Sequence, residues 1–313
     1  MLRALLLASL LILISHGAQA ATCTVDISDL NFGPVDTLSI STTESTAEVA
    51  IVCDQVSTEA TVVTICANLG AGSGGAQAGL RQIGSGSSTL SYQIFTDTAR
   101  SIPWGSSGNP SLGSPRAIEI PVSSTGASAT IYLYGAVPSG QADAAAGSYT
   151  SLFAPSDATF SYAEGGALDC GAPAGGSEAY ASFSVQGAVT ANCLLDVEDI
   201  DFGSVGIIDS DIDASGDLSI TCTPGTPYSV SLDGGLRGAT NPEQRLMQSA
   251  DSSVIYGLYT NPGRTSPWGE AAGTLVAGAG NGARQALPIY GRVPAQPVRP
   301  GNYSDIVVVV IAY

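Results

Sequence analysis

The sequence predicts an all-β protein with two immunoglobulin-like β-sandwich domains in tandem, of which the C-terminal one lacks its last strand. Three observations lead to this fold class. The 38 glycines and 17 prolines, among many Ser, Thr, Val and Ala residues, are typical of short strands joined by tight turns. One set of motifs occurs twice in the same order. The second copy stops before a strand that the first copy contains.

The first twenty residues are typical of a secretory signal peptide. Arg3 supplies the positive start, residues 4–14 form an apolar core, and Ala18-Gln19-Ala20 is a small-residue cleavage site. The apolar run is too short to span a membrane. We therefore expect residues 1–20 to be removed and the mature, exported chain to begin at Ala21.

The composition excludes most catalytic and nucleic-acid-binding functions. The formal net charge is −17, the chain has no lysine, and its one histidine, His16, lies in the signal peptide. Such acidity argues against nucleic acid as a partner. Without histidine, lysine or a free thiol, the usual triads, Schiff bases and zinc sites are not available. We expect a non-enzymatic protein without cofactor or metal, although a carboxylate pair as in glycosidases stays open.

An internal repeat divides the mature chain into residues 21–190 and 191–313. The stretch CTVDISDLNFGPVD from Cys23 returns as CLLDVEDIDFGSVG from Cys193. Further pairs follow in the same order: a second cysteine, a segment ending in PWG, IYLYGAVP with LPIYGRVP, and GSYTS with GNYSD. Five landmarks in one order predict two homologous domains, each with alternating strands at sandwich spacing.

Six cysteines in an exported chain predict disulfides. The repeat makes Cys23–Cys53 and Cys193–Cys222 equivalent bridges that join the first strand of each copy to a later one. Cys66 and Cys170 remain, both in the first copy, and we expect them to pair with each other.

The two copies differ at their ends. In the first copy the strand that ends at Tyr162 is followed by AYASFSVQGAV, residues 179–189, which alternates like one more strand. The second copy ends at Tyr313, the position equivalent to Tyr162, within an apolar run with strong β propensity. We therefore expect an open groove in this domain, lined by Ile306, Val308 and Val310. A strand from another molecule would fill it by β-augmentation.

Only Ala21 and Thr22 precede Cys23 in the expected mature chain, which leaves no N-terminal strand to donate. A subunit that accepts a strand but donates none is expected at the end of a polymer.

The cysteine-led motifs, the PWG segments and the terminal GNYSDIVVVVIAY resemble the spore coat protein U domain family. That family includes the subunits of archaic (Csu-type) chaperone–usher pili, and a two-domain member without a donor segment resembles their tip adhesin. The resemblance implies three partners: a periplasmic chaperone that lends a strand, an outer-membrane usher, and an adjacent pilin whose strand replaces the chaperone's. It also implies secretion through the periplasm and a place at the pilus tip on the cell surface.

The resemblance further implies attachment to an abiotic or host surface, and hence biofilm formation, through apolar loops of the first domain. The first candidate is Leu152, Phe153, Ala154 and Pro155, beside three residues that the second copy lacks. The alternative is a strand bulge with Leu152 and Phe153 turned into the core. A weaker candidate is Ala144, Ala145 and Ala146, and another is the glycine-rich stretch 69–80. For both stretches, flexible connections between strands are the favoured explanation.

Other features favour ordinary structural roles. Trp104 and Trp268, and likewise Tyr149 and Tyr303, occupy equivalent places in both copies, which favours packing over binding. The carboxylates of residues 196–201 alternate as on a solvated strand face, which is a better explanation than calcium binding. Two rival functions stay open at this stage: a sugar-binding (lectin) pilus tip and a secreted spore-coat-like structural protein.

Overall fold

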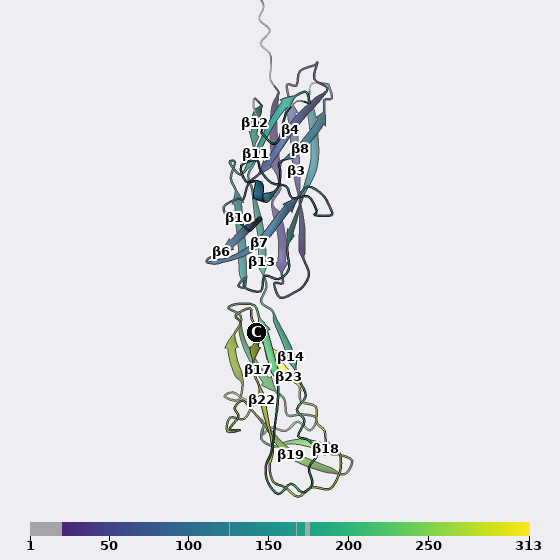
Figure 1. Cartoon of the computed structure of the whole chain (residues 1–313), viewed down its shortest axis with the longest axis vertical. Coiled ribbons are helices and arrows are strands. Elements are labelled where there is room, and N and C mark those ends of the chain that lie inside the picture. Colours follow the sequence, from purple (N-terminus) through teal and green to yellow (C-terminus); the bar gives the residue numbers. More distant parts are fainter. Residues whose placement is uncertain (1–20, 125, 167, 173–175) are drawn as a thin grey trace, which may run out of the picture.

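The computed structural model describes residues 21–124, 126–166, 168–172 and 176–313, so the predicted signal peptide, residues 1–20, lies outside the described part. The described residues form 23 strands and one short 3-10 helix, Pro110–Leu112. Figure 1 shows the strands in two halves that lie end to end. The predicted all-β class with a two-domain layout is thus confirmed. Within the described residues, no helix has the length and apolar character that a membrane span requires.

The N-terminal half, here called the N-terminal sandwich, consists of β1 to β13. Their bounds are β1 Thr22–Ile27, β2 Leu30–Val35, β3 Thr43–Asp54, β4 Val62–Leu69, β5 Ala76–Gln77, β6 Leu80–Ser85, β7 Ser88–Phe95, β8 Arg116–Pro121, β9 Ala127–Val137, β10 Gly147–Phe153, β11 Ala158–Glu164, β12 Ser177–Tyr180 and β13 Phe183–Val189. One sheet has the order β1-β3-β9-β7-β6-β10-β13-β2, with β5 paired to β6, and the other has the order β12-β11-β4-β8.

The C-terminal half, here called the C-terminal sandwich, consists of β14 to β23. Their bounds are β14 Cys193–Val197, β15 Ile212–Gly216, β16 Leu218–Cys222, β17 Pro227–Leu232, β18 Arg245–Ser249, β19 Ser252–Tyr259, β20 Val276–Ala279, β21 Gln285–Ala286, β22 Ile289–Val293 and β23 Val309–Ala312. The sheets have the orders β14-β16-β21, β15-β22-β19-β18 and β20-β17-β23.

Each sandwich has its own apolar core, built by alternation along its strands. In β3, the side chains of Ala47, Val49, Ile51 and Cys53 are buried, and the residues between them face outward or are partly covered. The core of the C-terminal sandwich is a separate cluster that includes Leu218, Ile220 and Val230 among other residues. Two cores of this kind are typical of two folded units.

The residues that the two copies share have structural roles in both. The buried indoles of Trp104 and Trp268 donate hydrogen bonds to backbone carbonyls of β4 and β17, respectively, over 2.9 and 3.0 Å. The hydroxyls of Tyr149 and Tyr303 each donate to the carbonyl oxygen four residues earlier, over 2.7 Å. Both predictions from the repeat are confirmed: the indole bonds fix the PWG segments to β4 and β17, and the tyrosine bonds fix the loops that precede Tyr149 and Tyr303.

The structure contains three disulfides, and they are the three pairs that the repeat predicts. Cys23–Cys53 and Cys193–Cys222 join equivalent strand pairs, β1 to β3 and β14 to β16. Cys66–Cys170 occurs only in the N-terminal sandwich, where it ties the segment after β11 to the outer face of β4. Since Thr64 also donates to the carbonyl of Gly165, that segment covers β4, which is buried along nearly its whole length.

A short connection joins the two sandwiches. β13 ends at Val189 and β14 begins at Cys193, so only residues 190–192 lie between them. The side-chain amide of Asn192 donates to Asp36 over 2.9 Å, and the backbone amide of Ala146 donates to the carbonyl of Pro224 over 3.3 Å. These contacts hold two loops of the N-terminal sandwich, the one after β2 and the one before β10, against the C-terminal sandwich.

The Cys66–Cys170 bridge gives a first testable prediction. We expect the double substitution Cys66→Ala and Cys170→Ala to lower the stability of the N-terminal sandwich by roughly 2–5 kcal/mol, because it frees a long loop in the unfolded chain. Urea unfolding followed by tryptophan fluorescence in a Trp268→Phe background reports on Trp104 alone. In the same background, replacing Cys193 and Cys222 by Ala should leave this transition in place. An unchanged Trp104 transition after loss of Cys66–Cys170 would contradict the prediction.

Candidate functional site: an open groove in the C-terminal sandwich

The N-terminal sandwich is closed by its last strand, β13. This strand pairs with β10 in antiparallel register from Gly147↔Val189 to Phe153↔Phe183, and with β2 in parallel register. Phe183, Val185 and Val189 are buried. β13 therefore supplies the backbone partners of both neighbours and the last layer of apolar side chains between them.

In the C-terminal sandwich, the counterparts of β2 and β10 are residues 200–205 and 301–307. The repeat makes Ile200 equivalent to Leu30, Phe202 to Phe32, and Tyr303 to Tyr149. Neither counterpart belongs to a named strand, and no described residues form a strand between them. An isolated bridge between Gln248 and Ser304 is the pairing that the structure records for these two segments. The site of the closing strand is open.

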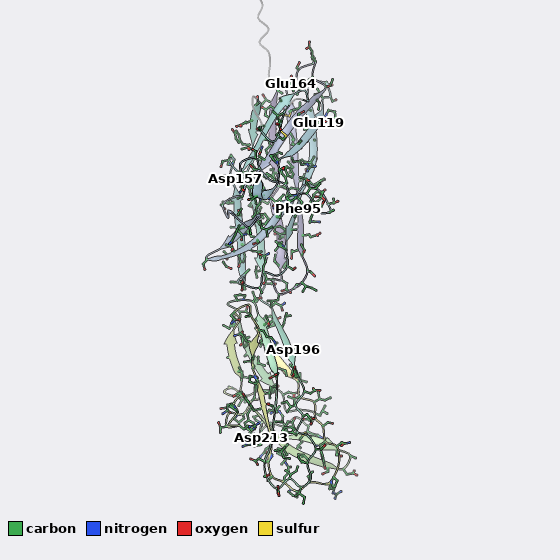
Figure 2. The ribbon with its side chains drawn as sticks, in the orientation of Figure 1. Phe95, Glu119, Asp157, Glu164, Asp196 and Asp213 are labelled. Atoms are coloured by element: carbon green, nitrogen blue, oxygen red, sulfur yellow. A yellow bond between two sulfur atoms is a disulfide. The ribbon has the colours of Figure 1, made fainter. Side chains whose placement is uncertain are left out.

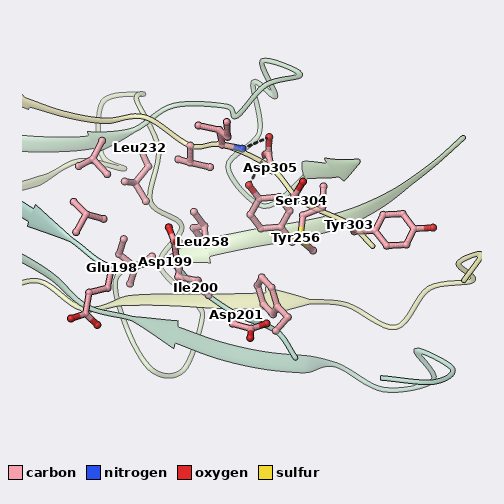
Figure 3. A pocket seen from close by; sticks show the side chains of 17 residues that line it. Glu198, Asp199, Ile200, Asp201, Leu232, Tyr256, Leu258, Tyr303, Ser304 and Asp305 are labelled. Atoms are coloured by element: carbon pink, nitrogen blue, oxygen red, sulfur yellow. Dashed lines mark hydrogen bonds between the residues drawn. The ribbon is translucent and has the colours of Figure 1, made fainter. Parts of the chain in front are cut away.

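Two adjoining cavities of about 640 and 920 Å³ occupy this place. Figure 3 shows the smaller one, with the wall of residues 198–201 on one side and that of residues 303–305 on the other. The apolar side chains that line the smaller cavity come from both walls and from the strands beneath: Val197, Ile200, Phe202, Leu232, Met247, Leu258, Ile289, Ile306, Val307 and Val309. We call the two cavities together the groove.

The groove exposes side chains whose counterparts are part of a dry core. Leu30, Tyr149 and Phe153 are fully buried under β13, whereas Ile200, Tyr303 and Val307 are only partly buried. Complete burial of one such side chain stabilises a fold by roughly 1.5–3 kcal/mol. The C-terminal sandwich lacks this stabilisation at several positions because its groove is uncovered. An apolar hollow of this size on a protein surface is typical of a binding site.

Asp305 provides a carboxylate in the wall formed by residues 303–305. Asp305 is the counterpart of Ser151, and its side chain accepts hydrogen bonds from the hydroxyl of Tyr256 over 2.6 Å and from the backbone amide of Leu236 over 2.9 Å. Burial is the main cause that raises the pKa of Tyr256, and the hydrogen bond to Asp305 is the second. This hydroxyl therefore stays protonated and remains a donor. These hydrogen bonds hold this wall of the groove in place.

The groove is continuous with a free strand edge. β23 pairs with β17 on one side, just as β11 pairs with β4. On its other side β11 pairs with β12, whereas no described strand pairs with the corresponding edge of β23. Residues 177–189 of the N-terminal sandwich thus fill two places, an edge and a groove, that are both vacant in the C-terminal sandwich.

The predicted groove residues Ile306, Val308 and Val310 need correction. Ile306 borders the groove but is itself 64% exposed, and Val308 and Val310, which are 51% and 46% exposed, do not line it. The inward residues are Val307, Val309 and Ile311, which pack against the core. Side chains alternate along a strand, and a run that is apolar at every position does not indicate which set faces inward.

The predicted surface loop at residues 152–155 is only partly exposed. Phe153 is buried and its ring stacks on that of Phe183 at a centroid distance of 4.4 Å, so its prediction as a surface anchor is wrong. Leu152 is 60% exposed, and Ala154 and Pro155 are also exposed. Here the chain crosses from one sheet to the other, on the flank of the N-terminal sandwich at the height of Asp157 in Figure 2.

The predicted alanine loop is not at a free end of the molecule. Ala144 is buried, Ala145 accepts the hydrogen bond of Tyr149, and Ala146 donates to Pro224 in the C-terminal sandwich. These residues therefore stabilise the connection between the two sandwiches, contrary to the prediction that they project toward a surface. The glycine-rich stretch 69–80 packs against β10, since the amide of Ser73 donates to the carbonyl of Leu152.

The sequence of both sandwiches matches a known protein family. A model of the spore coat protein U domain matches residues 9–154 and 179–310, so that both sandwiches are covered. The chain belongs to the spore coat protein U domain family. No curated protein sequence matches it.

This spore coat protein U domain protein is similar to several solved structures. One is a chain of the pre-assembly complex between the CsuC chaperone and the CsuE tip adhesion subunit of archaic chaperone–usher Csu pili from Acinetobacter baumannii. It is 16% identical, with a TM-score of 0.52, over 93% of this chain and 100% of that one. The CupB6 tip adhesin from Pseudomonas aeruginosa is 14% identical, with a TM-score of 0.38, over 93% and 94% of the two chains.

The acidic stretch 196–201 borders the groove. Asp196 lies outside the groove lining and forms an exposed ion pair with Arg284 at 3.3 Å, whereas Glu198, Asp199 and Asp201 line the groove. Among the described residues, no three acidic, cysteine or histidine side chains are grouped as a metal site would require.

Leu152 and Phe153 provide a matched pair for a second prediction. We expect Phe153→Ala to lower the stability of the N-terminal sandwich by about 3–5 kcal/mol, because it removes a buried ring from the contact with Phe183. Leu152→Ser should change it by less than about 0.5 kcal/mol, because the side chain is mostly exposed. The fluorescence of Trp104 in the Trp268→Phe background measures both. Equal effects of the two substitutions would contradict the assignment of Phe153 to the core.

Proposed function

We propose that this protein is the tip adhesin subunit of a chaperone–usher pilus and that it mediates surface attachment and biofilm formation. In this proposal, residues 1–20 direct export and are removed. Residues 21–190 form the adhesive domain, and residues 191–313 form the domain that joins the pilus. The protein is secreted through the periplasm and lies at the pilus tip on the cell surface.

The observation that carries the proposal is the difference between the two sandwiches. One is closed by β13, and the other has an apolar groove and a free edge on β23 where the equivalent strand would lie. A strand from an adjacent pilin would complete the C-terminal sandwich by donor-strand complementation. β13 is a model for this strand: it runs antiparallel to β10 and parallel to β2, and every second side chain is inward.

The exposed groove also accounts for a chaperone and an usher as partners. An open apolar groove with an unpaired strand edge favours aggregation, so the subunit needs a protein that covers both during export. A periplasmic chaperone that lends a strand meets this need, and the usher is where the pilin's strand replaces it. The fold similarity to a chain of a chaperone–tip subunit complex supports the tip position.

Attachment is assigned to the N-terminal sandwich. Leu152, Ala154 and Pro155 expose an apolar segment on its flank, and burial of Leu152 on a dry abiotic or host surface is worth roughly 1.5–3 kcal/mol. Many pili on one cell would multiply this small contribution by avidity.

The third prediction tests strand acceptance. A copy of residues 177–189 is added after Tyr313 through a short Gly-Ser linker, and we call this variant the extended chain. We expect the added strand to occupy the groove and the edge of β23, and therefore to raise the Tm and reduce the binding of a hydrophobic dye. Differential scanning calorimetry and dye fluorescence measure these changes.

The control for this experiment is an extended chain in which the copies of Phe183 and Val185 are replaced by Ser. These two side chains are buried in the N-terminal sandwich, so the control keeps the strand but loses its apolar contacts. Strand acceptance would be refuted by equal Tm values for the original, extended and control chains.

The fourth prediction tests attachment through Leu152. Beads coated with the extended chain should adhere to polystyrene, and Leu152→Ser should lower the number that resist washing several-fold, since avidity amplifies a small loss per contact. Ile102→Ser is a matched control, because Ile102 is 58% exposed and Leu152 is 60% exposed. Equal adhesion of the Leu152→Ser and Ile102→Ser beads would remove Leu152 from the binding surface.

A further inference from the structure

We propose that Asp199 sets the register of the strand that enters the groove, by accepting a hydrogen bond from one backbone amide of that strand. The inference rests on the proposed function and adds a positioning residue to it. It also states a requirement on the partner, which must present a free N–H group at one defined position.

The N-terminal sandwich contains this hydrogen bond within one chain. The backbone amide of Ser184 in β13 donates to Oδ1 of Asp29 over 2.7 Å. Asp29 directly precedes β2, and the parallel ladder between β13 and β2 begins at the next pair, Val185↔Leu30. The carboxylate thus binds the closing strand where the ladder starts, and hydrogen bonds to a charged acceptor are stronger than neutral ones.

Asp199 is the counterpart of Asp29 in the repeat, and Ile200 is the counterpart of Leu30. Asp199 lines the groove, and Figure 3 shows it on the wall of residues 198–201. The structure records no hydrogen bond or ion pair for its carboxylate among the described residues. The same acceptor is therefore used in the closed sandwich and unused in the open one.

Asp201 and Asp196 do not have this role. Asp201 accepts a hydrogen bond from the amide of Gly203, just as its counterpart Asn31 accepts one from Gly33, so both are engaged within their own turns. Asp196 is paired with Arg284 outside the groove. Asp199 therefore has two properties together: it lines the groove, and its counterpart Asp29 binds the closing strand of the N-terminal sandwich.

The register follows from the pairing in the N-terminal sandwich. The residue that donates to Asp199 corresponds to Ser184, so the residues before and after it correspond to Phe183 and Val185 and enter the groove. The partner strand therefore has apolar residues on both sides of the donor position. It cannot have proline there, because proline has no N–H.

The test uses Asp199→Ala in the extended chain, which carries the copy of residues 177–189, and in the original chain. We expect Asp199→Ala to lower the folded-to-unfolded ratio of the C-terminal sandwich about tenfold in the extended chain and to leave it unchanged in the original chain. Asp196→Ala removes the same charge outside the groove and should act equally in both chains. Urea unfolding in a Trp104→Phe background reports on Trp268 alone.

A second measurement separates the hydrogen bond from a general effect of charge. The original chain is titrated with a synthetic peptide of residues 177–189 and with the same peptide N-methylated at Ser184. We expect the methylated peptide to bind about tenfold more weakly to the original chain, and the ratio of the two affinities to shrink in the Asp199→Ala variant.

The outcomes distinguish the two proposals. If neither the added strand nor the peptide stabilises the C-terminal sandwich, the proposed strand acceptance fails, and the role of Asp199 fails with it. If both stabilise it and Asp199→Ala has the same effect with and without the strand, strand acceptance stands and the register role of Asp199 is overturned. Equal discrimination between the two peptides by both chains would also overturn it.

Discussion

The structure depends on one constraint: the two segments on either side of the closing strand need a strand between them. The edges of these segments that face each other have no other strand partner among the described residues, and unpaired polar groups beside an exposed apolar core are unfavourable. The N-terminal sandwich meets the constraint with β13, which pairs with β2 and β10 at once. In the C-terminal sandwich no described strand lies between the equivalent segments, and this is the main structural difference between the two sandwiches.

The open sandwich nevertheless keeps a firm framework around its groove. The Cys193–Cys222 disulfide joins β14 to β16, and the buried guanidinium of Arg245 donates to the carbonyls of Leu232 and Trp268. In the N-terminal sandwich, Arg81 donates to the carbonyls of Leu69 and Trp104. Because this network is the same in the closed and in the open sandwich, the framework around the groove does not depend on a closing strand. A preformed site loses less conformational entropy on binding.

The sequence was sufficient for the features that repeat. The fold class, the two equivalent disulfides and the structural roles of the shared Trp and Tyr residues follow from comparing the two copies, and Cys66–Cys170 is the pair that remains. The direction of single side chains does not follow. Because every position from Ile306 to Ile311 is apolar, the sequence does not show which alternate side chains face inward. Phe153 resembles a loop residue in the sequence, and only the structure shows that its ring packs on Phe183 of β13.

Contacts between residues far apart in the chain could not be predicted from the sequence either. The role of Ala146 depends on Pro224, which lies in the other sandwich, and the role of Asp29 depends on an amide 155 residues away. No local pattern marks Asp29 as different from Asp26. The structure shows that Asp29 binds the amide of Ser184, and the repeat makes Asp199 the counterpart of Asp29. Asp199 is identified only when the two observations are combined.

The three-residue connection after β13 has a mechanical consequence. A pull between an anchored pilus and an attached surface would enter the N-terminal sandwich through residues 190–192 and hence through the end of β13. Tension would then act along the length of that strand, and the ladders on both of its edges would be loaded together in shear, not opened one bond at a time. In the proposed pilus tip, the strand that completes the N-terminal sandwich would thus also bear the load.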